Sequence, residues 1–274
     1  MTPQLTILSL GWGVQSWTLA AMSALGELPK VDYAIHADTT WEREQTYTFA
    51  AAWAPWLEAH GVEVVTVTDA AQAAAATTMK TDIPAFTAGQ NGAQIIDGQL
   101  RRQCTGRWKI DPQNVQMRAE LERRGLKKTP GVIEKWLGIS KDEWQRAKHA
   151  DVKYITHRYP LLEMDMSRAN CVTWLKAHDL PVPGKSACVF CPFHNKRAWQ
   201  DMKRAGGRDW EIALQVDAQI RDTRPPYPLF VHRGRVPLAE AVQIPEDYGM
   251  QQPDMFGPAE DDELATCDSG HCFL

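Results

Sequence analysis

The stretch Ser9-Leu10-Gly11-Trp12-Gly13-Val14-Gln15-Ser16 decides the fold that we predict for this chain. It follows the apolar run at residues 5–8, which is typical of a strand, and precedes residues 17–22, which are typical of a helix. Glycine lets the backbone approach an oxyanion closely, and the N-terminus of the following helix presents N–H groups to it. The pattern therefore predicts an anion-binding loop, with a plain strand-to-helix turn as the alternative.

The same pattern recurs along the next part of the chain. Residues 31–37 predict a second strand that ends at Asp38, and an amphipathic helix follows, in which Pro55 should cause a kink or a break. Residues 62–67 are almost entirely valine and threonine, which favours a third strand buried on both faces. Alternating strands and helices predict an α/β fold with a doubly wound parallel sheet, and ligands bind beyond the carboxyl ends of such strands. Asp38 then either contacts a nucleoside or caps the next helix.

Length and composition set outer limits on the architecture. The 274 residues allow one large α/β domain with an appendage. We expect a nucleotide-binding core over 1–115, helical additions over 116–245 that return to the core, and a flexible tail over 246–274. The net charge of −4 gives no global field that would attract nucleic acid or a membrane. We see no export signal or membrane span and expect a cytoplasmic protein, in which six cysteines indicate reduced thiols, a metal or redox chemistry.

A cationic segment follows a stretch without periodicity. Within residues 70–98 only 73–76 suggest a short helix, and the loop at 81–98 is long enough to favour a functional role. Residues 101–112 then combine four cations with a cysteine. A solvated surface is the ordinary interpretation of such a charge run. Arg107 and Lys109 are nevertheless suitable anion contacts, arginine through a bidentate fork and lysine as a point charge.

The region after residue 115 is interpreted as helical. Helices are expected over 116–124 and 132–138, and a capping box at 140–143 should open a third. A helix-turn-helix over 131–149 that reads DNA is disfavoured, because its second helix offers only Arg146 and Lys148 as cations and carries two acids. Ser167 should cap a further helix, and two more are expected over 196–203 and 210–221, followed by a short strand at 229–232.

Cys188-Val189-Phe190-Cys191 is the strongest metal or redox signal, since a C-x-x-C turn directs two thiolates at one ion. Cys104 and Cys171 are further candidate ligands, with His194 as a substitute. Cys171 is equally well interpreted as a small buried residue on a helix. Cys267 and Cys272 lie in the tail, and either serve a reactive role or are incidental.

These motifs resemble the phosphoadenosine phosphosulfate (PAPS) reductase-like family of the PP-loop, or adenine nucleotide alpha hydrolase-like, superfamily. The first loop resembles the PP-loop Ser-Gly-Gly-x-Asp-Ser, with Leu10 and Gln15 in place of a glycine and the aspartate. The segment Ala-Asp-Thr-x-x-Glu at 37–42 is similar to the second nucleotide-binding segment of that family. Cys-Thr-x-x-x-Lys-Ile-x-Pro at 104–112 resembles a segment of sulfonucleotide reductases, with Thr105 where a second cysteine stands.

The resemblance implies a set of site residues. Adenine nucleotide (ATP, adenylyl sulfate or its 3′-phosphate, with or without Mg²⁺) would be bound by Ser9, Gly11, Gly13, Gln15, Ser16, Asp38, Thr39, Arg107 and Lys109. A [4Fe–4S] cluster, or alternatively zinc, would be bound by Cys104, Cys171, Cys188 and Cys191. Cys272 or Cys267 would be the catalytic nucleophile.

The function implied first is reduction or transfer of sulfur from an adenylyl sulfate, with a thiol protein as electron or sulfur donor. The alternative is ATP-dependent insertion of sulfur into a nucleic acid, which Gln15 disfavours because the loop lacks its acid. A second alternative is a nucleotide-sensing module without enzymatic activity.

Overall fold

The computed structural model describes residues 3–69, 82–91, 94–95 and 97–243, and its largest sheet has five parallel strands. Their order is β3-β2-β1-β8-β9. The chain thus runs outward in one direction from β1 and returns on the other side of it, so the predicted α/β fold with a doubly wound parallel sheet is confirmed. The strands are β1 (Leu5–Ser9), β2 (Tyr33–Asp38), β3 (Glu63–Thr68), β8 (Ile133–Trp136) and β9 (Ile155–Arg158).

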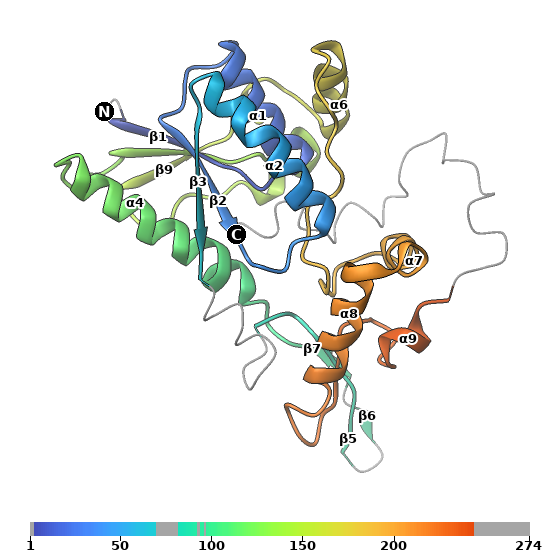
Figure 1. The fold of residues 1–274 in the computed structure, drawn as a ribbon. Helices are drawn as coiled ribbons and strands as arrows, with labels where there is room; N and C mark the ends of the chain where they lie inside the picture. The colour runs from blue at the N-terminus through green and yellow to red at the C-terminus, as the bar shows by residue number, and fades with distance from the viewer. Residues whose placement is uncertain (1–2, 70–81, 92–93, 96, 244–274) are drawn as a thin grey trace.

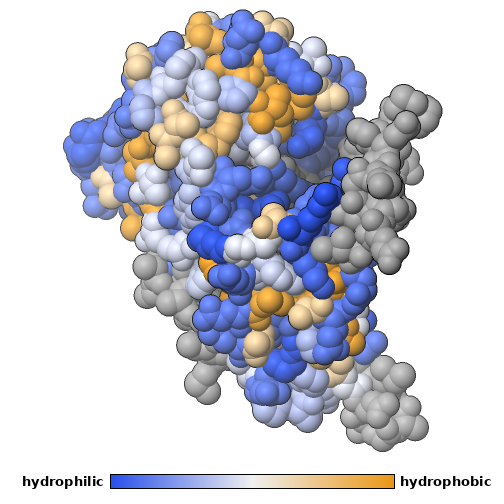
Figure 2. Space-filling model, turned by 45° about the vertical axis from the view of Figure 1, so that its right-hand side comes forward, coloured by the Kyte–Doolittle hydropathy of each residue, from blue (hydrophilic) through white to orange (hydrophobic). Residues whose placement is uncertain are grey.

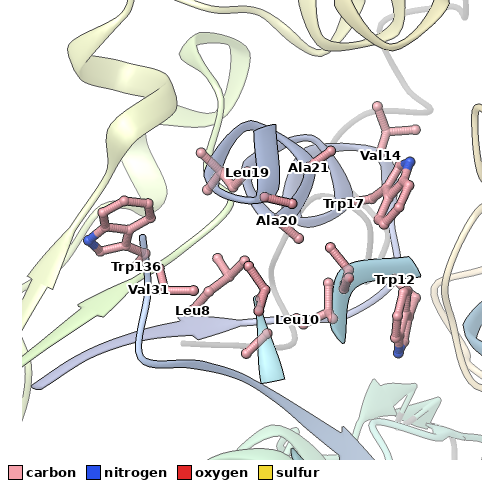
Figure 3. Close-up of a cluster of buried hydrophobic side chains, with 14 of the residues drawn as sticks. Leu8, Leu10, Trp12, Val14, Trp17, Leu19, Ala20, Ala21, Val31 and Trp136 are labelled. Carbon is pink, nitrogen blue, oxygen red and sulfur yellow. The ribbon is translucent and has the colours of Figure 1, made fainter. Parts of the chain in front are cut away.

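Helices cover both faces of this sheet (Figure 1). On one face α1 and α2 pack over the strands, and α6 lies against α1. Figure 3 shows Leu19, Ala20 and Ala21 of α1 beside the apolar side chains of β1 and the loop after it. On the other face α4 packs through Met117 and Leu121. The bounds are Val14–Leu25 for α1, Glu44–Ala59 for α2, Asp111–Arg123 for α4 and Arg168–Ala177 for α6.

The helix predicted over 132–138 is wrong: this segment contains β8, which pairs with β1 over residues Leu5 to Leu8. Ile133, Lys135 and Trp136 are buried there. A short apolar run bounded by glycines fits a buried strand as well as a helix, and only pairing in the sheet separates the two. Part of the region interpreted as helical, including β8 and β9, therefore belongs to the main sheet.

Three other local predictions also need correction. β3 is an edge strand whose residues are half-buried or exposed, so its valine-rich composition does not reflect burial on both faces. The helix α2 continues through Pro55, where aromatic residues on either side, Trp53 and Trp56, pack into the same cluster. The helix expected from residue 140 is the 3₁₀-helix η2 (Lys141–Arg146), and its N-cap Ser140 makes no side-chain capping bond. Ser167, in contrast, caps α6 in a complete capping box, as predicted.

A second core forms beside the sheet from helices and short strands. It holds Trp199, Val216 and Leu229 among others, and the buried Asp217 accepts hydrogen bonds from the N–H groups of Val231 and Leu238. Figure 2 shows hydrophilic residues gathered across the middle of one face of the molecule. The elements are α7 (Lys196–Ala205), α8 (Gly207–Ile220), α9 (Leu238–Ala241), β4 (Phe86–Thr87), β7 (Gly98–Gln99) and β10 (Leu229–Phe230).

Four small elements complete the fold. The π-helix η1 (Thr105–Ile110) leads into α4, α5 (Pro160–Glu163) follows β9, and β5 (Gln90–Asn91) pairs with β6 (Gln94–Ile95). Among the helices of the described ranges, none has the length and apolar character needed to cross a membrane. The short helix expected at 73–76 and the tail with Cys267 and Cys272 lie outside the described residues.

Candidate functional site

The loop after β1 is organised by the side chain of Ser16. The Ser16 hydroxyl accepts a hydrogen bond from the Gly11 N–H at 3.2 Å and donates one to the Gly13 carbonyl at 3.3 Å. The Leu10 N–H donates to the Ile35 carbonyl, which ties the start of the loop to β2. The helix α1 then begins at Val14 with Gly13 as its N-cap and without a side-chain capping bond. The amides in the first turn of α1 therefore have no capping side chain as acceptor, and an anion could bind there only under this condition.

The left-handed backbone position of this loop falls on a tryptophan. Trp12 has a φ of 59°, whereas Gly13 has a φ of −87°, a value that any residue adopts. Trp12 is 2% exposed, and its ring contacts those of Trp17, His36 and Phe49. Packing of the indole therefore holds a conformation that is costly for a side-chain-bearing residue. The φ of Gly13 does not require glycine, so the role expected for it remains close approach of the backbone to an oxyanion.

The loop after β8 lies directly against the start of α1. A Cβ atom added to Gly138 would come within 2.8 Å of the Ser16 backbone nitrogen. The Gln15 side chain reaches the same segment: its Nε2 lies 3.4 Å from the Ser140 hydroxyl and 3.4 Å from Glu143 Oε2. Because the chain runs away from β1 and β8 in opposite directions, this is the switch point of the sheet, where ligands of doubly wound folds bind.

The second expected segment, after β2, is held by its own contacts. Asp38 Oδ1 accepts hydrogen bonds from the Thr40 N–H and from the Tyr47 hydroxyl, each at 2.8 Å. Asp38 thus stabilises its own turn, whereas the N-cap of α2 is Arg43. The Thr39 hydroxyl lies 3.3 Å from Cys188 Sγ, so this segment meets the C-x-x-C motif.

Both expected anion contacts on η1 are already paired with acids. Lys109 Nζ lies 3.2 Å from Glu42 Oε1, with the two side chains 8% and 1% exposed. Burial acts to lower the pKa of Lys109, but the Glu42 carboxylate more than offsets it, and the pKa lies above its usual value. Arg107 Nη1 donates to Asp82 Oδ1 at 2.7 Å. Glu42 is the acid of the Ala-Asp-Thr-x-x-Glu segment, but its pairing with Lys109 was not expected, and Asp82 was not recognised from the sequence as part of this site.

Three of the four candidate metal ligands line one small cavity. Cys104, Cys188 and Cys191 surround about 20 Å³ together with Lys109 and aromatic side chains. Burial raises the pKa of the Cys104 thiol to about 12, and burial also raises the pKa values of Cys188 and Cys191. The thiol is the stable form of all three at neutral pH.

The expected set of four cysteine ligands is not assembled. Cys171 is buried on α6 within the core beneath α1, where it contacts Thr18, and this is the structural role that we considered for it. Within the described ranges, no group of three or more His, Cys, Asp or Glu side chains is arranged to hold a metal ion. His194 is not a substitute, because its Nε2 is hydrogen-bonded to the Cys188 carbonyl at 2.9 Å. The donors within the described residues therefore do not fit a [4Fe–4S] cluster or structural zinc, each of which takes four ligands.

The segment before the C-x-x-C motif connects the two loops at the end of the sheet. The Ser186 hydroxyl donates to the Gly11 carbonyl at 2.5 Å. Two residues later, the backbone of Cys188 forms an isolated antiparallel β-bridge with that of Glu42, and Cys188 Sγ lies 3.9 Å from Glu42 Oε1. The structure thus brings the loop after β1, the end of β2 and the thiols into one neighbourhood. The Ser9 hydroxyl, at the end of β1, donates a hydrogen bond to Oε1 of the buried Gln113 on α4 at 3.3 Å.

No protein-family model matches this chain, and no curated protein matches it. Among solved structures, the chain is similar to phosphoadenylyl-sulfate (PAPS) reductase from Candida auris, in a phosphate complex. That similarity has a TM-score of 0.41 and 13% sequence identity, and it covers 67% of this chain and 76% of that chain.

Proposed function

We propose that this protein is an enzyme that binds an adenine nucleotide and acts on sulfur, reducing or transferring the sulfur of an adenylyl sulfate. The contact between Thr39 and Cys188 carries the proposal, because it links a loop at the ligand-binding end of the sheet to a cluster of thiols. A parallel sheet alone hosts many functions. A cavity lined by thiols, next to a loop that can present helix N-terminal amides, supports an anionic substrate that contains sulfur; the attacking thiolate comes from outside this cluster.

The nucleotide would lie across the carboxyl ends of β1 and β2. Its phosphate groups would accept hydrogen bonds from the loop Ser9–Ser16, including Gly11, Gly13 and Gln15, and from the first turn of α1. Asp38 and Thr39 would contact the nucleoside. Lys109 and Arg107 would contribute positive charge, although each forms an ion pair with an acid, Glu42 and Asp82 respectively.

The attacking group would be a tail thiolate, Cys272 or Cys267. The thiolate is the nucleophilic form of cysteine, and the raised pKa values of Cys104, Cys188 and Cys191 disfavour it at those positions. The thiolate would attack the sulfur of the adenylyl sulfate, breaking the bond between sulfur and the bridging oxygen. The nucleoside phosphate leaves with the electron pair of that bond, and an enzyme S-sulfonate forms.

A second thiol completes the reaction. It would lose its proton, attack the enzyme sulfur of the S-sulfonate and form a disulfide, and sulfite would leave with the electron pair. Two thiols are then oxidised and the sulfate sulfur is reduced by two electrons. A dithiol protein would reduce the disulfide and regenerate both cysteines.

Sulfite release tests this proposal. The full chain would be incubated with adenosine 5′-phosphosulfate or its 3′-phosphate and excess dithiothreitol. Variants Cys272→Ser and Cys267→Ser would be compared with Ser269→Ala, a change in the same tail that removes no thiol. We expect sulfite from the wild type and Ser269→Ala, and a loss of turnover in at least one cysteine variant with nucleotide affinity retained.

Other outcomes would replace the proposal. Pyrophosphate released from ATP without any sulfite would favour ATP-dependent sulfur insertion into a nucleic acid. Tight nucleotide binding without turnover of either substrate would favour a sensing module.

A further inference from the structure

Arg146 lies at the switch point of the sheet and was not expected to belong to the site. It ends η2, the 3₁₀-helix that follows the loop after β8, and is 7% exposed. The Glu143 carboxylate, which lies 3.4 Å from Gln15 Nε2, also accepts a hydrogen bond from Arg146 Nη1 at 2.7 Å. One carboxylate therefore connects this arginine to the first turn of α1.

One edge of the Arg146 guanidinium is left without a partner. Its Nε and Nη2 atoms are both buried and make no hydrogen bond within the described part of the chain. These two N–H groups point the same way from one edge of the planar group, and arginine uses such an edge to bind two oxygens of a carboxylate or phosphate. Buried donors are normally satisfied, so an unsatisfied fork at a ligand-binding position indicates a missing acceptor.

The surroundings of Arg146 also favour a bound anion. Burial lowers its pKa to about 10; Glu143 offsets part of this effect, and the nearby Arg102 adds to the lowering. The guanidinium therefore stays positively charged at neutral pH, and the Glu143 carboxylate only partly offsets the cost of burying that charge. Arg102 in turn lies over the Phe193 ring at 5.5 Å and shares the cysteine cavity, so the two arginines extend from α1 towards the thiols. Lys109 and Arg107, by contrast, are already paired with buried acids.

We propose that Arg146 binds a tetrahedral oxyanion, the phosphate or sulfate of the nucleotide, through a bidentate contact from Nε and Nη2 beside the first turn of α1. This inference rests on the proposed function for the identity of the nucleotide. It adds the residue that recognises the oxyanion, and it separates that role from Lys109 and Arg107.

Isothermal titration of Arg146→Lys tests the fork, since lysine keeps the charge but loses the bidentate edge. The probes are adenosine 5′-phosphosulfate, AMP and adenosine, which lacks the oxyanion. We expect the affinity for the two anionic probes to fall about tenfold to a hundredfold, and the affinity for adenosine to stay the same. A merely structural role would lower all three.

Arg123→Lys is the matched control. Arg123 uses the same two atoms, Nε and Nη2, to bind Glu120 at the surface of α4. Its substitution therefore removes a bidentate contact within the protein and none with a ligand. Its affinities should stay within twofold of the wild type. Wild-type affinity of Arg146→Lys for adenosine 5′-phosphosulfate would overturn the inference while leaving the proposed function intact.

A second arm uses inorganic sulfate and phosphate and does not depend on nucleotide binding. If the wild type bound no adenylate, the proposed function would fail. Sulfate or phosphate should still raise the melting temperature of the wild type and Arg123→Lys, but not that of Arg146→Lys. An equal shift in all three proteins, or none in the wild type, would refute the oxyanion site.

Discussion

The buried pair of Lys109 and Glu42 should dominate the stability of the site. Replacing Lys109 by methionine keeps the length of the side chain and removes its charge. Glu42 would then stay 1% exposed, with Oε2 already lacking a hydrogen-bond partner in the described structure. At 3.2 Å and an effective dielectric constant of about 20, the lost attraction is about 5 kcal/mol. Breaking a buried pair by removing one partner costs about 3–5 kcal/mol, so we expect a loss in that range.

Urea unfolding monitored by tryptophan fluorescence would measure this loss. Lys141→Met is the matched control, because Lys141 pairs with Asp165 at 2.7 Å while both side chains are more than half exposed. Exposed pairs contribute about 0–1 kcal/mol. The expected loss of unfolding free energy is therefore several-fold larger for Lys109→Met than for Lys141→Met.

A double variant identifies the source of the effect. If the uncompensated Glu42 carboxylate causes the loss, Glu42→Gln combined with Lys109→Met should recover at least half of it. The reasoning is refuted if Lys109→Met loses less than about 1 kcal/mol, the range of an exposed pair, or if the double variant is as unstable as the single one. Should the single variant not fold, recovery of a folded double variant still supports the explanation.

Three further predictions concern the same region. Gly138→Ala should destabilise the protein by about 1–3 kcal/mol in urea unfolding, because its Cβ would meet the Ser16 backbone, whereas Gly106→Ala, with open space around its Cβ, should not. Cys104 should resist alkylation by iodoacetamide at pH 7.5, as judged by peptide mass spectrometry, because burial raises its pKa to about 12; labelling as fast as in unfolded protein would contradict this. Burial lowers the pKa of His194 to about 3, below its unfolded value, so the unfolded chain binds the extra proton and stability should fall as the pH drops from about 6.5, by up to about 1.4 kcal/mol per pH unit. His194→Asn should flatten that part of the stability profile; an unchanged slope would assign it to other groups.

Local patterns in the sequence were enough to predict the strand and the helix on either side of the loop Ser9–Ser16. The apolar run before Ser9, the glycines and the helical pattern after them depend on neighbours within a few residues, and both β1 and α1 form as predicted. The capping box at Ser167 is equally local and is also confirmed. The C-x-x-C motif and the family resemblance led us to expect Cys104, Cys171, Cys188 and Cys191 as one ligand set, of which Cys104, Cys188 and Cys191 line a common cavity.

Only the tertiary structure decided which residues complete the site. The segment with β8 has a pattern that suits a helix or a buried strand, and pairing with β1 makes it a strand. That pairing places Gly138 at the start of α1 and Arg146 near Gln15 through Glu143, although 128 positions separate Gln15 from Glu143. No local period encodes such a contact.

Burial likewise changed the meaning of charges and thiols that the sequence displays. A cationic run predicts anion contacts, but the fold buries Lys109 against Glu42. Nothing in the sequence around either residue indicated that the two would pair. Cys171 has the spacing of a ligand, yet the packing of α6 against α1 places it in another core. Spacing along the chain limits which side chains can meet, and whether they do depends on packing between distant segments, which the chain acquires only when the sheet is complete.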